Sequence, residues 1–180
     1  MKKGILFLMM LIVFKYSFTQ SILTPVDADS KVHFVIKNFG IKTGGDFTGL
    51  KGNIKFAPEN LAACSFDVTV DASTINTDNE SRDGHLKKAE YFDVTTYKTI
   101  RFKSTKVVLS SVAGRYYIFG EVTIKGVTKP VEFGFSAKPK DGGYIFEGEF
   151  GINRRDFAVG GSSISMSDNL TVSLSVFAKK

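Results

Sequence analysis

Apolar and polar residues alternate along most of the chain after residue 30. The clearest example is segment 64–72, in which Phe66, Val68 and Val70 share one face and the residues between them are polar. A period of two places successive side chains on opposite faces of a β-strand. The segment therefore predicts a strand with one buried face and one solvated face.

Seven further segments repeat this pattern, so the sequence predicts eight strands. Gly49 and Gly52 interrupt the second strand and indicate a bend or a bulge there. The apolar positions of these seven strands are Val32, Phe34 and Ile36; Phe47, Ile54 and Phe56; Ile100, Phe102 and Val108; Tyr116, Ile118, Val122 and Ile124; Val131, Phe133, Phe135 and Ala137; Tyr144, Phe146, Phe150 and Ile152; and Leu170, Val172, Leu174 and Val176.

Short connections rich in turn residues join most of these strands, as at Gly126 and at residues 140–143. Such connections favour an antiparallel meander. Eight antiparallel strands can close into a barrel, which leaves no exposed edge and has room inside for one small ligand. We therefore predict an all-β fold, an eight-stranded antiparallel barrel. A two-sheet sandwich is the alternative that the same pattern allows.

The longest interruption of the alternation is the polar segment 76–102, which is far longer than the tight turn that two neighbouring strands require. Asp78 or Asn79 can cap a short helix whose first turn contains Glu80. Leu86 then lies on the apolar side of that helix. We expect one short helix in this inserted segment, placed across the wall or the mouth of the barrel.

Residues 1–20 have the features of a secretory signal peptide. Lys2 and Lys3 precede an apolar run, residues 4–14, which is too short for an ordinary transmembrane helix. Cleavage near Ser21 would release a domain of residues 21–180, exported to the periplasm or secreted, with no stable membrane span. A retained membrane anchor is the alternative.

Removal of this segment would lower the net charge from +6 to +3, because it contains three cationic residues and no acid. Such a mild balance gives no electrostatic indication of a nucleic-acid partner.

The residues that usually carry catalysis or bind metals are scarce. Cys64 is the single cysteine and permits no intramolecular disulfide, and His33 and His85 are the two histidines. A zinc site needs three or four ligands, usually His or Cys. The sequence also lacks the motifs of nucleophile elbows and phosphate loops. We therefore predict no metal, no cofactor and no enzymatic activity.

The inserted segment resembles the signature of the YceI-like family. The matching residues are Thr77, Arg82, Asp83, His85, Leu86, Tyr91, Phe92 and Asp93. Two further runs resemble the family. Residues 120–133 match its Gly-x-Leu-Thr-Ile-x-Gly-Val-Thr-Lys run, with Val122 in place of leucine. In residues 151–161, Arg155, Asp156 and Phe157 are taken to match its Arg-x-Asp-Phe-Gly loop, with Ala158 in place of glycine.

This resemblance implies an exported protein with a lipocalin-like barrel that carries a long isoprenoid lipid. We therefore expect a non-catalytic protein that holds an isoprenoid or a similar amphiphile for transport, storage or protection. One alternative is an exported protein-interaction module with a filled barrel and no ligand, and another is an enzyme that acts on a lipid. A homodimer is compatible with each of these.

Two groups of candidate site residues follow. One group lies on the strands and the other in the inserted segment. The group in the inserted segment either ties the helix to the barrel, which we favour, or clamps a ligand head group. The expected apolar cavity wall consists of Phe34, Phe66, Val68, Ile100, Phe102, Val122 and Phe133. The expected cluster at the cavity mouth consists of Arg82, Asp83, His85, Tyr91 and Phe92. His33, opposite Phe34 on its strand, is expected on the outer surface.

Overall fold

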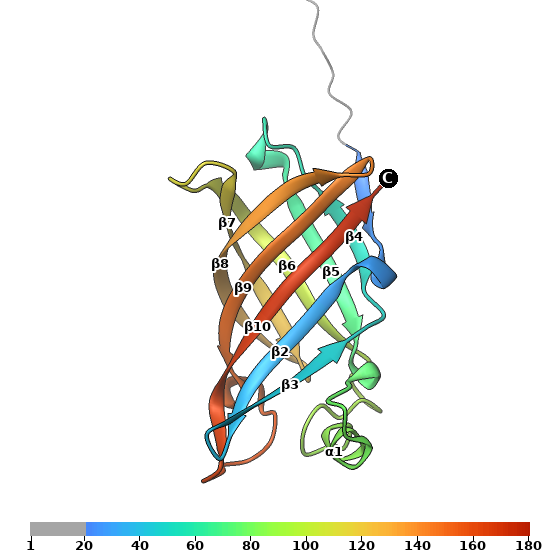
Figure 1. The fold of residues 1–180 in the computed structure, drawn as a ribbon, viewed down its shortest axis with the longest axis vertical. Helices are drawn as coiled ribbons and strands as arrows, with labels where there is room; N and C mark the ends of the chain where they lie inside the picture. Colours follow the sequence, from blue (N-terminus) through green and yellow to red (C-terminus); the bar gives the residue numbers. More distant parts are fainter. Residues whose placement is uncertain (1–20) are drawn as a thin grey trace, which may run out of the picture.

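The computed structural model describes residues 21–180, and the predicted signal peptide lies outside the described residues (Figure 1). Its strands are β1 (Ile22–Pro25), β2 (Lys31–Asn38), β3 (Ile41–Phe47), β4 (Lys51–Lys55), β5 (Ser65–Asp71), β6 (Thr99–Leu109), β7 (Arg115–Ile124), β8 (Val127–Lys140), β9 (Gly143–Asn153) and β10 (Met166–Lys179). Its helices are α1 (Glu80–Leu86) and the short 3-10 helices η1 (Asp27–Asp29), η2 (Leu61–Ala63), η3 (Ala72–Thr74) and η4 (Arg154–Phe157).

The strands form one antiparallel sheet that closes on itself. Their order is β1-β4-β5-β6-β7-β8-β9-β10-β2-β3, and β1 pairs also with β10. Because β1 and β2 both pair with β10, they are two parts of one bent strand, with η1 between them. In the same way β3 and β4 pair with β2 and β1. The result is the predicted eight-stranded antiparallel barrel, and the two-sheet sandwich is excluded.

The predicted break at the glycines separates β3 from β4. Gly49 has a φ of +73° and Gly52 a φ of +137°, which are conformations that other residues rarely adopt. At Gly52 an added Cβ would lie 2.1 Å from the carbonyl oxygen of Asp67 on β5. Glycine here therefore allows β4 to approach β5 closely at the bend.

One end of the barrel is filled by aromatic rings. It is the end at which β10 finishes and at which the β6–β7 and β8–β9 turns lie (Figure 1). The ring of Phe56 is at the centre of this aromatic plug. Its centroid lies 5.1–6.4 Å from those of five other rings, namely Phe66, Tyr116, Phe135, Tyr144 and Phe146. Most of these pairs meet edge to face, a favourable geometry for aromatic rings.

The other end is covered by the inserted segment and by the loop between β9 and β10 (Figure 1). The side chain of Asn79 caps α1 by accepting a hydrogen bond from the Arg82 amide at 2.9 Å, as one of the two predicted caps. Within the described sheet β3 pairs only with β2, and its other edge meets the segment before α1 through the bridge between Asp46 and Asn76. The insertion thus completes the wall where the ladder of strands stops.

Candidate functional site

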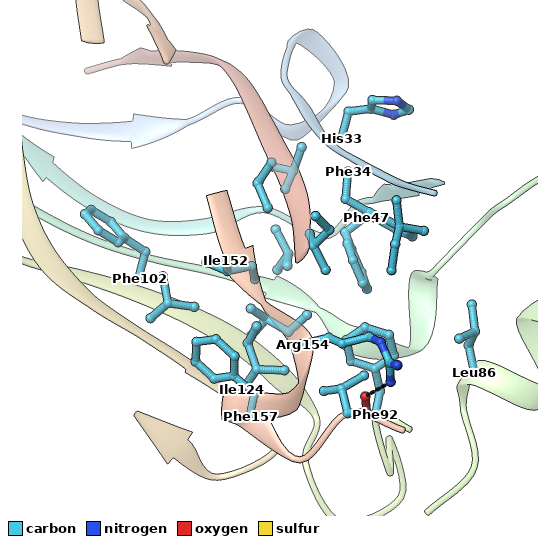
Figure 2. Close-up of a pocket in the computed structure, with 18 of the residues that line it drawn as sticks. His33, Phe34, Phe47, Leu86, Phe92, Phe102, Ile124, Ile152, Arg154 and Phe157 are labelled. Carbon is cyan, nitrogen blue, oxygen red and sulfur yellow. Dashed lines mark hydrogen bonds between the residues drawn. The ribbon is translucent and has the colours of Figure 1, made fainter. Parts of the chain in front are cut away.

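An apolar cavity of about 220 Å³ occupies the half of the barrel that lies next to α1. Residues of β2, β3, β5, β6, β7, β9 and β10 form its wall, and Figure 2 shows rings and branched aliphatic side chains converging on it. The barrel interior is thus filled at one end and hollow at the other.

Five of the seven predicted wall residues line this cavity, namely Phe34, Val68, Ile100, Phe102 and Val122. Phe66 and Phe133 are buried inside the barrel but are not among the lining residues. Phe66 belongs to the aromatic plug. Phe133 contacts two rings of the wall, with its centroid 4.8 Å from that of Phe150 and 5.8 Å from that of Phe102. The alternation of the strands indicates which side chains face inward, whereas it carries no information on how far along the barrel axis the interior stays open.

The prediction omitted several residues of the wall. Phe47 on β3 contacts Phe34 and also Phe92 of the insertion, with ring centroids 5.8 and 5.5 Å apart. The others that deepen the cavity are Ile124, Phe150, Ile152, Phe157, Leu170, Val172 and Leu174. Most of them lie at inward positions of predicted strands, so the alternation that identified Val122 could have identified them too.

Thr77 is the point at which the insertion is tied together. Its hydroxyl donates a hydrogen bond to Asp83 Oδ1 at 2.5 Å and accepts one from Arg82 Nε at 2.7 Å. Its backbone N–H also donates to Asp83 Oδ1 at 2.9 Å, and its carbonyl accepts from Arg82 Nη2 at 2.5 Å. Thr77 and Asp83 are both buried. These bonds join α1 to the segment that is bridged to β3, which supports a structural role for the pair Arg82 and Asp83.

The other members of the predicted mouth cluster are arranged as a rim. Arg82, Tyr91 and Phe92 line the cavity, whereas Asp83 and His85 do not. His85 is exposed and packs its ring against that of Tyr91, with centroids 5.0 Å apart. The aromatic pair therefore reaches the cavity, and the histidine supports one ring of that pair from the solvent side.

We expect Asp83→Asn to lower the free energy of unfolding by about 1–3 kcal/mol, because a charged acceptor of two hydrogen bonds in a buried site is replaced by a neutral one. Urea unfolding measures this loss. The control is Glu80→Gln on the same helix, where the side chain is exposed, and it should lower the free energy of unfolding by only about 0.3 kcal/mol through the helix dipole. Equal stability of the two variants would show that the bonds to Thr77 do not hold the helix in place.

Arg154 is a buried arginine at the cavity, with only 3% of its surface exposed. Its guanidinium donates to Asp168 Oδ1 at 2.6 Å and to the carbonyls of Ser167, Val159 and Gly161 at 2.9–3.1 Å. Figure 2 shows Arg154 with one hydrogen bond drawn as a dashed line. A buried charge is tolerated when it is paired and its donors are satisfied. Arg154 therefore fixes the loop between η4 and β10 around the cavity.

This finding corrects the expected match of Arg155 to the Arg-x-Asp-Phe-Gly loop. In that spacing the arginine stands two positions before Asp156, which is Arg154, and Arg155 is exposed. Arg154 and Arg155 are adjacent and both precede the Asp-Phe pair, so the sequence analysis matched the wrong one to the motif.

The mouth is narrowed where the two covering loops meet. The amide of Gly160 donates to the Glu90 carbonyl at 2.9 Å. Lys125 Nζ, from the β7–β8 turn, donates to the carbonyls of Glu90 and Ala158 at 3.2 and 2.9 Å. The insertion and the η4 loop thus form one continuous rim.

Groups that could perform chemistry lie apart from one another. Burial raises the pKa of the Cys64 thiol, so the reactive thiolate is disfavoured. His33 is among the residues that border the cavity, but its ring points away from the other side chains in Figure 2 and pairs with Asp46, with Nδ1 and Oδ1 2.7 Å apart. Residues 21–180 contain no group of three or more His, Cys, Asp or Glu side chains arranged to hold a metal ion. In this same part of the chain we find no helix with the length and hydrophobicity of a membrane span.

This fold and sequence are similar to those of several known proteins. The model of the YceI-like domain matches residues 24–178. A UPF0312 protein of Vibrio cholerae is 32% identical over 105 residues, which cover 58% of this chain and 55% of the relative, so the chain spans about half the length of that protein. Among solved structures, Burkholderia cenocepacia BcnA superposes with a TM-score of 0.81 at 24% identity, covering 86% of this chain and 99% of BcnA. A polyisoprenoid binding domain from Saccharophagus degradans has a TM-score of 0.69 at 17% identity, covering 89% and 99%. These two likenesses concern the fold.

Proposed function

The chain belongs to the YceI-like domain family, and on this premise we propose that it is a non-catalytic lipid-binding protein whose cavity holds the apolar chain of an isoprenoid or a similar amphiphile. The observation that carries the proposal is the apolar cavity in an otherwise filled barrel. The likeness in fold to a polyisoprenoid binding domain supports the same class of ligand.

The chemistry of the wall suits a branched hydrocarbon. Burial of each methylene group contributes about 0.8 kcal/mol, so each five-carbon unit would contribute roughly 4 kcal/mol before the costs of association. The aromatic plug closes the far end, so the ligand would enter with its apolar tail first and leave its polar end at the rim. A long chain would fill the cavity and either displace rim side chains such as Leu86 or extend out through the mouth.

Arg82 is the group of the mouth cluster that a polar head group could reach, since it is exposed and also borders the cavity. Its hydrogen bonds to Thr77 already use Nε and Nη2. We therefore propose that the cluster of Arg82, Asp83 and His85 acts first as a support for the rim. Head-group contact by the remaining guanidinium N–H groups is secondary.

Solvent extraction of the purified protein followed by mass spectrometry tests the ligand. We expect an isoprenoid-type lipid in near-stoichiometric amount, and we expect Val68→Phe to lose most of it, because the larger side chain fills the cavity. Val35→Phe is the matched control, since Val35 lies on the opposite face of β2 from Phe34 and Ile36 and outside the cavity lining. An empty protein, or equal lipid content in the two variants, would contradict the proposal.

We also propose that residues 1–20 direct export of a domain of residues 21–180. The support is the cationic start and short apolar run of this segment. Mass spectrometry of protein collected outside the cytoplasm should find Ser21 as the first residue. Protein that keeps Met1 in a membrane fraction would instead indicate a retained anchor.

A further inference from the structure

Three large apolar residues are largely exposed to solvent at the mouth end of the barrel. Phe39 is 79% exposed, Ile41 is 71% exposed, and Ile164 is as accessible as in an extended chain. Phe39 and Ile41 lie at the turn between β2 and β3, and Ile164 lies in the loop before β10. The Phe39 amide donates to the carbonyl of Ser165 at 2.8 Å, so the turn and the loop form one projecting tip. We call this set of three side chains the mouth tip.

The mouth tip is continuous with the cavity. Asn38, Thr43 and Met166 belong to the same two chain segments and line the cavity wall. Figure 1 shows the β2–β3 turn and the start of β10 together at the end of the barrel that carries α1. The tip therefore projects beside the opening through which a ligand would pass.

The backbone of Phe39 has an unfavourable conformation. Its φ is +49°, in the left-handed region where asparagine and glycine are the preferred residues of a tight hairpin turn. The ring lies outside the hydrophobic core of the barrel, so the fold gains little packing from it in return. An apolar side chain that costs the turn energy and contributes little to the core indicates a contact outside the molecule.

The charge around the tip is positive. Lys37 and Lys42 are cross-strand neighbours immediately behind it, and both are exposed. Segments 36–45 and 157–167 contain no acidic residue. Three acids flank these segments. Asp46 is paired with His33, Asp168 is paired with Arg154, and Asp156 is exposed next to Arg155.

We propose that the mouth tip docks on the surface of a lipid bilayer that contains anionic lipids. Three apolar side chains at the points of two loops can enter the boundary between head groups and acyl chains, as the apolar faces of interfacial segments do. Lys37 and Lys42 would then meet anionic head groups, and each lysine near such a surface strengthens binding roughly fivefold.

A second copy of the chain is a poorer occupant of this surface. A stable dimer buries about 800 Å² on each partner, which requires a broad face, whereas the mouth tip is a small projection. Docking on a bilayer would orient the cavity mouth toward the membrane and give an apolar ligand a path that avoids water. That last consequence rests on the proposed function, but the docking itself does not.

Flotation of purified protein with vesicles tests the docking. The protein should float with vesicles of phosphatidylcholine mixed with phosphatidylglycerol and only weakly with phosphatidylcholine alone. The double variant Phe39→Asn with Ile164→Ser should bind the mixed vesicles at least about tenfold more weakly, because two apolar side chains no longer leave water. Asparagine accepts the positive φ of the turn, so the melting temperature should not fall.

Leu109→Ser with Val112→Ser is the matched control. These side chains are 68% and 58% exposed at the β6–β7 turn, at the opposite end of the barrel, and their loss should leave vesicle binding unchanged. The proposal is overturned if the unchanged protein does not float with the mixed vesicles, or if both double variants bind equally. It is also overturned if the unchanged protein is a dimer, the Phe39→Asn, Ile164→Ser variant is a monomer, and that variant still binds the vesicles. That result would show that the mouth tip contacts a second copy of the chain. If the purified protein contains no lipid but still floats with the mixed vesicles, the docking proposal stands and the proposed ligand is contradicted.

Discussion

The substitution Phe56→Ala is expected to lower the free energy of unfolding by about 4 kcal/mol. Phe56 is 7% exposed, and its ring contacts more of the other rings of the aromatic plug than any other member does. Its removal leaves a cavity among rings that cannot easily collapse into it, since these rings are anchored on four different strands, β5, β7, β8 and β9. Urea unfolding followed by circular dichroism measures the loss.

Phe102→Ala removes the same group of atoms from the cavity wall and is the matched control. Phe102 is only partly buried and already borders empty space, so fewer contacts are lost. We expect a loss below about 2 kcal/mol in protein freed of ligand. Equal losses for the two substitutions would show that the plug and the wall are packed alike, contrary to the structure.

The substitution Arg154→Leu should lower the free energy of unfolding by about 3 kcal/mol. It leaves Asp168 and three backbone carbonyls without their shared donor, and removal of one partner from a buried ion pair typically costs about 3–5 kcal/mol. The lower end applies because the Asp168 side chain is 44% exposed and can be hydrated.

The neighbouring substitution Arg155→Leu provides the comparison. Arg155 is exposed, and a change at such a surface position usually alters stability by less than about 0.5 kcal/mol. Both variants are compared by the same urea titration, and proteolysis reports on the η4 loop. The assignment of the motif arginine to position 154 would have to be abandoned if Arg155→Leu were the more destabilising of the two.

The strands and the closed barrel could be predicted because each depends on local patterns. Period-two alternation identified part of each of the eight strands of the ring, although β1 and most of β3 were not predicted. The predicted interruption at Gly49 lies at the break between β3 and β4. The helix cap at Asn79 was one of two predicted positions. These features depend on neighbours within a few residues, and such neighbours can be read directly from a sequence.

The candidate site could be predicted only in part, because its position along the barrel axis depends on contacts between distant strands. Phe66 and Phe102 both face inward from adjacent strands, yet one lies in the plug and the other in the cavity wall. The difference arises from Phe56, which fills one end. Likewise, the sequence does not distinguish Arg154 from Arg155. Only Arg154 is bonded to Ser167 and Asp168, which lie more than ten residues further along the chain.

The closure of the ring by β10 also determines when the molecule can fold. Val32 pairs with Leu174 and Thr24 with Lys179, so the earliest and latest described strands must meet across nearly the whole chain. Contacts of such sequence separation make folding slow, because the entropy of loop closure opposes them. During synthesis β2 would therefore present an unpaired edge until β10 is made, and an unpaired edge is a site of aggregation. We expect the newly made chain to depend on a holding factor during this interval, and a truncation before Met166 to aggregate rather than form an open barrel.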